Sequence, residues 1–318
     1  MINNNEKFAI LTFYNANVNL SESIIKINEN LSIATEFPIE IDNYWKKWIG
    51  DIQSEKIKNS NLSIFFKEKV ENPNIIDRNN RECESKVYLF YCSLVTITEL
   101  LCDYFPLQFT GAKYNNIFEI QSFSQMLKPE FVNGTPFRRI DKTVIDDAIQ
   151  NYLALIQLSS LKKHSRIFRG INYFLDGITT DDWKNKLHNY VRVIEAFINP
   201  EIGNTQRQFK SRTELFIGPS FHSLMEKVYA IRSNIEHVHE IQRGFDNLNA
   251  TQFQKLTIIT QSISRYLLNF FLSNKNIWNY FEDSTIDEFW KLSPEKRMEI
   301  WSDNFDINSL LEEIDKLI

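Results

Sequence analysis

The scarcity of glycine and proline is the strongest constraint on what this chain can fold into. Its 318 residues include 8 Gly and 8 Pro, about 5% together, whereas globular proteins average about 12%. Because these two residues interrupt helices and mark turns, so low a content favours long helices. Hydrophobic residues make up 43% and charged residues 24%, as in soluble globular proteins, and the length predicts two domains.

The charge of the chain is unevenly distributed. A net charge of −5 argues against a protein that coats nucleic acid without specificity. Residues 138–243, however, carry 16 Lys and Arg against 12 Asp and Glu, whereas residues 1–137 carry 13 against 17 and residues 244–318 carry 7 against 12. The motif described below lies in the only net-positive third.

The cysteines and the apolar segments indicate the cellular compartment in which we expect the protein. Cys83, Cys92 and Cys102 are spaced nine and ten residues apart, which fits neither a disulfide framework nor the short CxxC pairs of a zinc site, so we expect buried, unreactive thiols. The N-terminus lacks the features of a signal peptide. The apolar stretch 256–272 is interrupted by polar residues and is too short to span a membrane. These features predict a cytoplasmic protein without membrane contact.

The N-terminal region, residues 1–137, mixes strand and helix patterns, so we predict an α+β fold for it. Segments 8–20 and 24–37 are rich in β-branched and aromatic residues, which favours strands. Segment 41–70 has a more helical pattern and 71–85 is a polar loop. The apolar run 87–101 fits either a strand or a buried helix.

After Gly134 and Pro136 the pattern changes to successive amphipathic helices, which predicts an all-α second domain over residues 138–318. Two stripes repeat at spacings of three and four: Ile145, Ile149, Tyr152, Leu153 and Ile156, and then Leu187, Tyr190, Val191, Ile194 and Phe197. Further helices are predicted over 205–217, from about 223 to 238, and over 251–272. We expect the aromatic tail with Phe289, Trp290 and Trp301 to pack back on this bundle, and the chain to be mainly helical.

An arginine and a histidine separated by four residues stand out in the fourth of these helices, as Arg232-Ser-Asn-Ile-Glu-His237. Arginine offers a planar, permanently charged fork for a phosphate, and histidine transfers protons near neutral pH. Positions five apart differ by about 140° around a helix and about 7.5 Å along it, so the two side chains do not meet on one straight helix. A two-fold interface could bring in the missing partners.

Four segments occur in an order that resembles the Apea-like branch of the HEPN superfamily (higher-eukaryote and prokaryote nucleotide-binding domains). They are RIFRGINYFLDGI at 166–178, LHNYVRVIEAFI at 187–198, QFKSRTELFIG at 208–218 and VYAIRSNIEHVH at 228–239. The resemblance covers roughly residues 140–290. It implies a dimerising helical bundle whose Arg-x4-6-His motifs face a shared cleft.

The resemblance also implies a function: a metal-independent endoribonuclease without a cofactor, of the kind found in bacterial anti-phage defence and toxin systems. Arg232 and His237 would be its catalytic residues, and RNA its substrate. The histidine would serve proton transfer and the arginine the phosphorane charge, leaving a 2′,3′-cyclic phosphate. A homodimer and a phage-derived trigger or inhibitor protein are the expected partners, and residues 1–137 would sense the trigger or restrain the nuclease.

Several alternatives remain open at this stage. Ser233 stands where many active members have Asn, Asp or His, which favours a non-catalytic module that binds RNA, a nucleotide or a protein. His239 satisfies the six-residue spacing and could replace His237. Arg232 and Glu236 could form a surface ion pair, and the chain could be a purely structural helical protein.

Two further features have both a structural and a functional interpretation. His237 and His239 suggest a metal pair, but on a helix they diverge by about 200°, which disfavours metal binding. The basic cluster of Lys162, Lys163, His164, Arg166 and Arg169 could follow an RNA backbone or could be a solvated helix end.

Overall fold

The computed structural model describes residues 2–130, 132–236 and 249–317, and the chain forms two compact units. One unit comprises Met1–Pro129 and Arg138–Tyr152, and the other Glu130–Phe137 and Leu153–Ile318. The predicted domain boundary after residue 137 falls where the two units exchange segments. Helices account for 56% of the chain, which confirms the prediction of a mainly helical protein.

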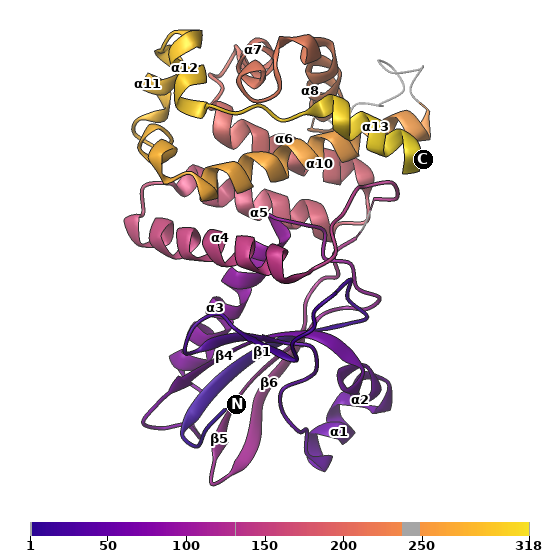
Figure 1. Ribbon diagram of the computed structural model, residues 1–318, viewed down its shortest axis with the longest axis vertical. Coiled ribbons are helices and arrows are strands. Elements are labelled where there is room, and N and C mark those ends of the chain that lie inside the picture. Colours follow the sequence, from indigo (N-terminus) through magenta and orange to yellow (C-terminus); the bar gives the residue numbers. More distant parts are fainter. Residues whose placement is uncertain (1, 131, 237–248, 318) are drawn as a thin grey trace. The chain divides into compact units, whose positions relative to one another are not determined.

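The first unit contains a six-stranded sheet in which all neighbouring strands are antiparallel, in the order β2-β3-β4-β1-β5-β6 (Figure 1). The strands are β1 (Glu6–Tyr14), β2 (Ile24–Lys26), β3 (Leu31–Ala34), β4 (Ser60–Lys69), β5 (Leu107–Tyr114) and β6 (Ile117–Gln125). Its helices are α1 (Asn43–Ile49), α2 (Asp51–Lys58), α3 (Arg78–Val95) and the start of α4 (Lys142–Leu161). The mixed fold predicted for the N-terminal region is therefore confirmed.

Two predictions within this unit need correction. The helical pattern predicted over 41–70 ends at α2, and the rest of that segment is strand β4. The polar loop predicted over 71–85 is shorter, because α3 begins at Arg78 after a capping box made by Asp77 and Asn80. The same helix decides the ambiguous apolar run that follows in favour of a buried helix up to Val95.

Strand β1 is buried because both faces of the sheet are covered at its position. Phe8 and Ile10 point to one face, where they share a hydrophobic cluster with Ile49 of α1. Phe13, of the opposite parity, stacks on Tyr91 of α3 with ring centroids 6.0 Å apart. Side chains alternate between the faces of a strand, so a strand covered on both sides has consecutive buried apolar residues, as at residues 8–11.

The second unit is built from helices in its described residues. They are the end of α4, then α5 (Ser165–Thr179), α6 (Trp183–Ile198), α7 (Thr205–Ile217), the 3-10 turn η1 (Pro219–Phe221), α8 (His222–Glu236), α10 (Ala250–Ser273), the 3-10 turn η2 (Lys275–Tyr280), α11 (Ile286–Lys291), α12 (Pro294–Trp301) and α13 (Ile307–Leu317). The predicted helices agree with α4, α6, α7 and α10 and with the start of α8, whose predicted end near residue 238 lies outside the described residues. Helix α5 was not predicted from an apolar stripe. Leu153 in α4 was expected to be buried but is 48% exposed.

Helix α6 is the centre of the second unit, since it packs against α5, α7, α8 and α10 (Figure 1). All five apolar residues of its predicted stripe are buried. The aromatic tail packs on these helices as predicted: Trp301 is fully buried and its ring lies 4.7 Å from that of Phe216 and 4.6 Å from that of Phe270. No helix among the described residues is both long and apolar enough to cross a membrane.

Candidate functional site

Helix α8 carries the motif arginine. Gly218, with a φ of +82°, ends α7, and Pro219 opens the short turn that leads into α8. Val228 and Ile231 of α8 are fully buried, and Arg232 follows directly on the same face with only 6% of its surface exposed. The apolar stripe therefore draws the guanidinium into the protein, where a cation requires acidic partners.

Two carboxylates from two helices supply those partners. The Nη2 atom of Arg232 lies 3.3 Å from Oε2 of Glu195 on α6, and its Nη1 donates to Oε2 of Glu236 on α8. Arg192 completes the group by donating to Glu195 at 3.0 Å and to Glu236 at 2.7 Å. The two arginines and two glutamates form a closed, charge-balanced network that ties α6 to α8.

This network changes the interpretation of Arg232. The pair with Glu236, which the sequence suggested as a possible surface ion pair, forms at a largely buried guanidinium. Glu195 was not anticipated, although a signal was present: it lies four residues after buried Val191 and three before buried Ile198. A carboxylate inside an apolar helical stripe predicts a buried cation as its neighbour.

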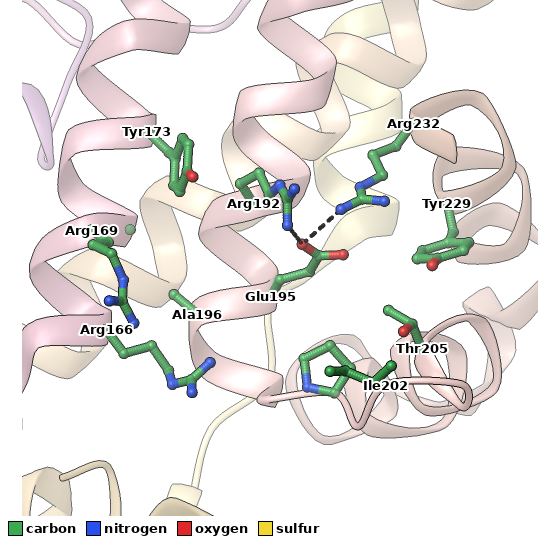
Figure 2. A pocket seen from close by; sticks show the side chains of 12 residues that line it. Arg166, Arg169, Tyr173, Arg192, Glu195, Ala196, Ile202, Thr205, Tyr229 and Arg232 are labelled. Atoms are coloured by element: carbon green, nitrogen blue, oxygen red, sulfur yellow. Dashed lines mark hydrogen bonds and ion pairs between the residues drawn. The ribbon is translucent and has the colours of Figure 1, made fainter. Parts of the chain in front are cut away.

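Arg232 also lines a pocket of about 490 Å³ among α5, α6, α7 and α8. Four arginines and two tyrosines contribute to its wall (Figure 2): Arg166, Arg169, Tyr173, Arg192, Tyr229 and Arg232. We call this the arginine pocket. Its size lies within the range of about 300–1,000 Å³ that is usual for small-molecule sites, and its excess of positive charge suits an anionic ligand.

Two small residues, Gly170 and Ala196, lie where α5 and α6 meet at the pocket. A Cβ atom on Gly170 would lie 3.0 Å from the Cβ of Ala196, so the two helices approach closely at this point. Both residues line the pocket. Larger side chains at either position would push the helices apart or fill the space between the arginines.

Several polar atoms at the pocket are buried without a hydrogen-bond partner in the described part of the chain. They are Nε of Arg166, Nε of Arg192, Nε of Arg232 and Oε1 of Glu195. Buried polar groups are nearly always hydrogen-bonded in proteins, so each exception needs an explanation, and a ligand that supplies the missing partner is one. Four such atoms around one pocket therefore mark it as a candidate binding site.

The predicted catalytic pair is described in part. His237, like the alternative His239, lies outside the described residues, so its distance from Arg232 stays a prediction. Another histidine, which the sequence did not single out, lies beside the network: His188 is one turn before Arg192 on α6. Burial and then the charges of Arg232 and Arg192 lower the pKa of His188, against the opposing effect of Glu236.

The basic cluster predicted over residues 162–169 is divided by the fold. His164 is 1% exposed, and its Nε2 lies 3.1 Å from a backbone carbonyl oxygen. Lys163 pairs with a glutamate at 3.3 Å. Arg166 and Arg169 line the arginine pocket, so these two members of the cluster keep a functional interpretation.

The thiols and acidic residues bear on metal chemistry. All three cysteines are buried, as predicted, and none forms a disulfide, and burial raises the pKa of Cys83 and Cys92 to about 12. In the part of the chain that the structure describes, no group of three or more His, Cys, Asp or Glu residues is arranged to hold a metal ion.

Comparison of the chain with protein-family models, with curated proteins and with solved structures finds no match. The resemblance to the HEPN superfamily therefore depends on the four sequence segments that carry it. Functional inference depends on the arginine pocket and the residues that line it.

Proposed function

We propose that the protein is a metal-independent endoribonuclease of HEPN type, whose second unit is an HEPN-like bundle with Arg232 and His237 at its active site. The observation that carries this proposal is the position of Arg232 in the wall of a pocket that three further arginines line. A guanidinium in such a pocket can stabilise charge that develops on a phosphate during transfer. Electrostatic stabilisation of this type is a large contribution to catalysis.

The chemistry needs a proton acceptor for the ribose 2′-hydroxyl and a donor for the departing 5′-oxygen. His237 would serve one step, and the same residue of a second protomer the other, because Arg232 and His237 diverge on a straight helix. The proposal therefore includes a homodimer that acts on cytoplasmic RNA. A role in anti-phage defence, with a phage-derived trigger or inhibitor, extends it.

The test uses single-stranded RNA and purified protein in EDTA. We expect fragments with 2′,3′-cyclic phosphate ends, and a loss of about 10²- to 10⁴-fold in rate for His237→Ala, the usual contribution of general acid-base catalysis. His239→Ala tests the alternative motif end. His222→Ala is the matched control, since His222 starts the same helix and does not line the pocket. Unchanged cleavage by both His237→Ala and His239→Ala would refute the proposed active site.

A second candidate is a non-catalytic module that binds RNA or a nucleotide. It is favoured by the contacts of Arg232, whose two terminal nitrogens already meet carboxylates of Glu195 and Glu236. Intact RNA after long incubation with the wild-type protein, together with binding that weakens as salt is raised, would support this candidate over the nuclease.

A further inference from the structure

Arg166 and Arg169 differ from the other two arginines of the pocket because, among the described residues, neither guanidinium forms an ion pair with a carboxylate. Within the described residues, neither guanidinium makes a hydrogen bond or an ion pair, and Nε of Arg166 is buried. Burial and the neighbouring charge of Arg169 lower the pKa of Arg166, while Asp283 and Asp287 oppose that shift. Two like charges held together at a pocket are stabilised when an anion binds between them.

Their positive charge is not favoured by their place on α5. Both lie within the first five residues of the helix, where the positive end of the helix dipole disfavours cations. The first N–H groups of α5 are instead satisfied by Asp283, which accepts from the backbone of Ser165 at 2.9 Å and of Arg166 at 3.1 Å. The arginine side chains are left to face the pocket (Figure 2).

An aromatic ring stands beside the two arginines on the same helix face. Tyr173 follows Arg169 by one turn and lines the same pocket, and Figure 2 shows its ring on α5 above Arg169. Among the described residues, the partly buried ring of Tyr173 makes no contact with another aromatic ring or a cation, whereas the ring of Tyr229 contacts Phe209 and Arg232. A ring of this kind can stack on a nucleobase.

We propose that Arg166 and Arg169 form a phosphate subsite for one unpaired nucleotide of RNA, with its base against Tyr173. This subsite is separate from the motif residues Arg232 and His237, and it names the substrate class of the proposed function: single-stranded RNA or loops. A base held in a pocket of about 490 Å³ must leave its neighbours, and unpaired bases do so at a smaller free-energy cost than paired ones. The inference shares the RNA ligand with the proposed function but does not require cleavage.

The experiment measures binding of a fluorescent 2′-O-methyl oligoribonucleotide by anisotropy over a range of salt concentrations. The methylated 2′-oxygen cannot attack the phosphate, so binding is separated from cleavage. For R166A/R169A we expect binding about tenfold weaker or more, because charge-assisted hydrogen bonds to phosphate are lost. The slope of log affinity against log salt should fall by about 0.7 for each phosphate contact removed.

Matched variants make the result specific. Arg207→Ala removes an exposed arginine of α7 that does not line the pocket, and it should bind as the wild type does. R166K/R169K keeps both charges and loses the bidentate fork, so it should retain most of the salt slope and lose affinity; it also serves if the alanine variant fails to fold. Tyr173→Leu should weaken binding of the oligonucleotide without changing the slope.

Three outcomes would overturn the subsite. In the first, R166A/R169A and Arg207→Ala have equal affinity for the oligonucleotide and equal salt slopes. In the second, the wild type binds duplex and single strand with equal affinity. In the third, R166A/R169A weakens the binding of adenosine monophosphate but not of the oligonucleotide, which would indicate a free nucleotide as ligand. If the expected binding is found but no RNA is cleaved, only the proposed nuclease fails. If RNA is cleaved but R166A/R169A binds normally, only the subsite fails.

Discussion

Two buried cations, one in each unit, have surroundings of different kinds. Lys7 of β1 is fully buried, and its Nζ donates to a backbone carbonyl, to Asp77 at 2.5 Å and to Asn80 at 2.8 Å. Arg232 of α8 is almost as buried, but its Nε has no hydrogen-bond partner among the described residues, and it borders the arginine pocket. Burial of a charge alone thus marks a structural site, and burial beside a pocket with unsatisfied atoms marks a functional candidate.

The largest expected effect comes from removing a carboxylate beside Arg232. Glu195→Ala leaves two arginines with Glu236 alone, so we expect the free energy of unfolding to fall by about 3 kcal/mol, the lower end for breaking a buried pair. Chemical denaturation measures it. Glu299→Ala, which breaks an exposed pair with Lys296, should have little effect. Equal losses in the two variants would show that the network adds nothing beyond a surface pair.

The corresponding change in the first unit is Lys7→Met. It leaves buried acceptors, among them the side-chain oxygen of Asn80, without their donor, and we expect a loss of about 2 kcal/mol. RNA binding should be unchanged, because Lys7 does not line the arginine pocket. Lys142→Met, at an exposed pair with Asp146, is the control for denaturation. Weaker RNA binding by Lys7→Met would break the contrast between the two cations.

The Lys7 site also predicts a pH dependence. The hydrogen bond from Lys7 lowers the pKa of Asp77 from its ordinary value of 3.8. The stabilisation is therefore complete at pH values above 3.8, the ordinary pKa. It is lost as the pH falls through the lowered pKa of Asp77 in the folded protein. Denaturation at several acidic pH values should show a steeper loss of stability in the wild type than in Asp77→Asn. Parallel curves of stability against pH for the two proteins would show that the hydrogen bond from Lys7 does not shift the titration of Asp77.

The smallest effect concerns His188 beside the arginine network. Burial and the charges of Arg232 and Arg192 lower its pKa below 6.5, so stability should fall as the pH drops from 6.5 to the folded-state pKa, because the unfolded chain binds the proton first. An NMR titration should show a higher pKa in Arg192→Met than in wild type, and no change in Arg207→Met. An unchanged pKa of His188 in Arg192→Met would show that the charge of Arg192 does not affect this histidine.

Much of the helical unit could be predicted from the sequence, because helices with one apolar face have a clear period. The stripe of α6 and the end of α7 before Gly218 were both predicted correctly. The sheet was harder. In β4, Leu62, Ile64, Phe65 and Phe66 are all buried, so the strand lacks the alternation of a half-exposed strand and looks like a buried helix. Strands β5 and β6 were not anticipated.

The candidate site was predictable at Arg232 and less so around it. The pocket depends on residues from four successive helices, and spacing along the chain does not reveal which of their side chains meet in space. Gly170 and Ala196, which let α5 and α6 approach, carry no chemical signal of their own. Glu195 did carry one, as a carboxylate among buried apolar neighbours.

The packing of Gly177 on α5 against Tyr190 on α6 links the identities of two positions. A Cβ atom at residue 177 would lie 2.5 Å from Cε1 of Tyr190, and the tyrosine ring, which is fully buried, has no room to retreat. Any side chain at 177 would therefore require a smaller residue at 190. In homologous chains these two positions should covary, and a glycine thirteen residues before a buried aromatic offers a signature for recognising distant relatives.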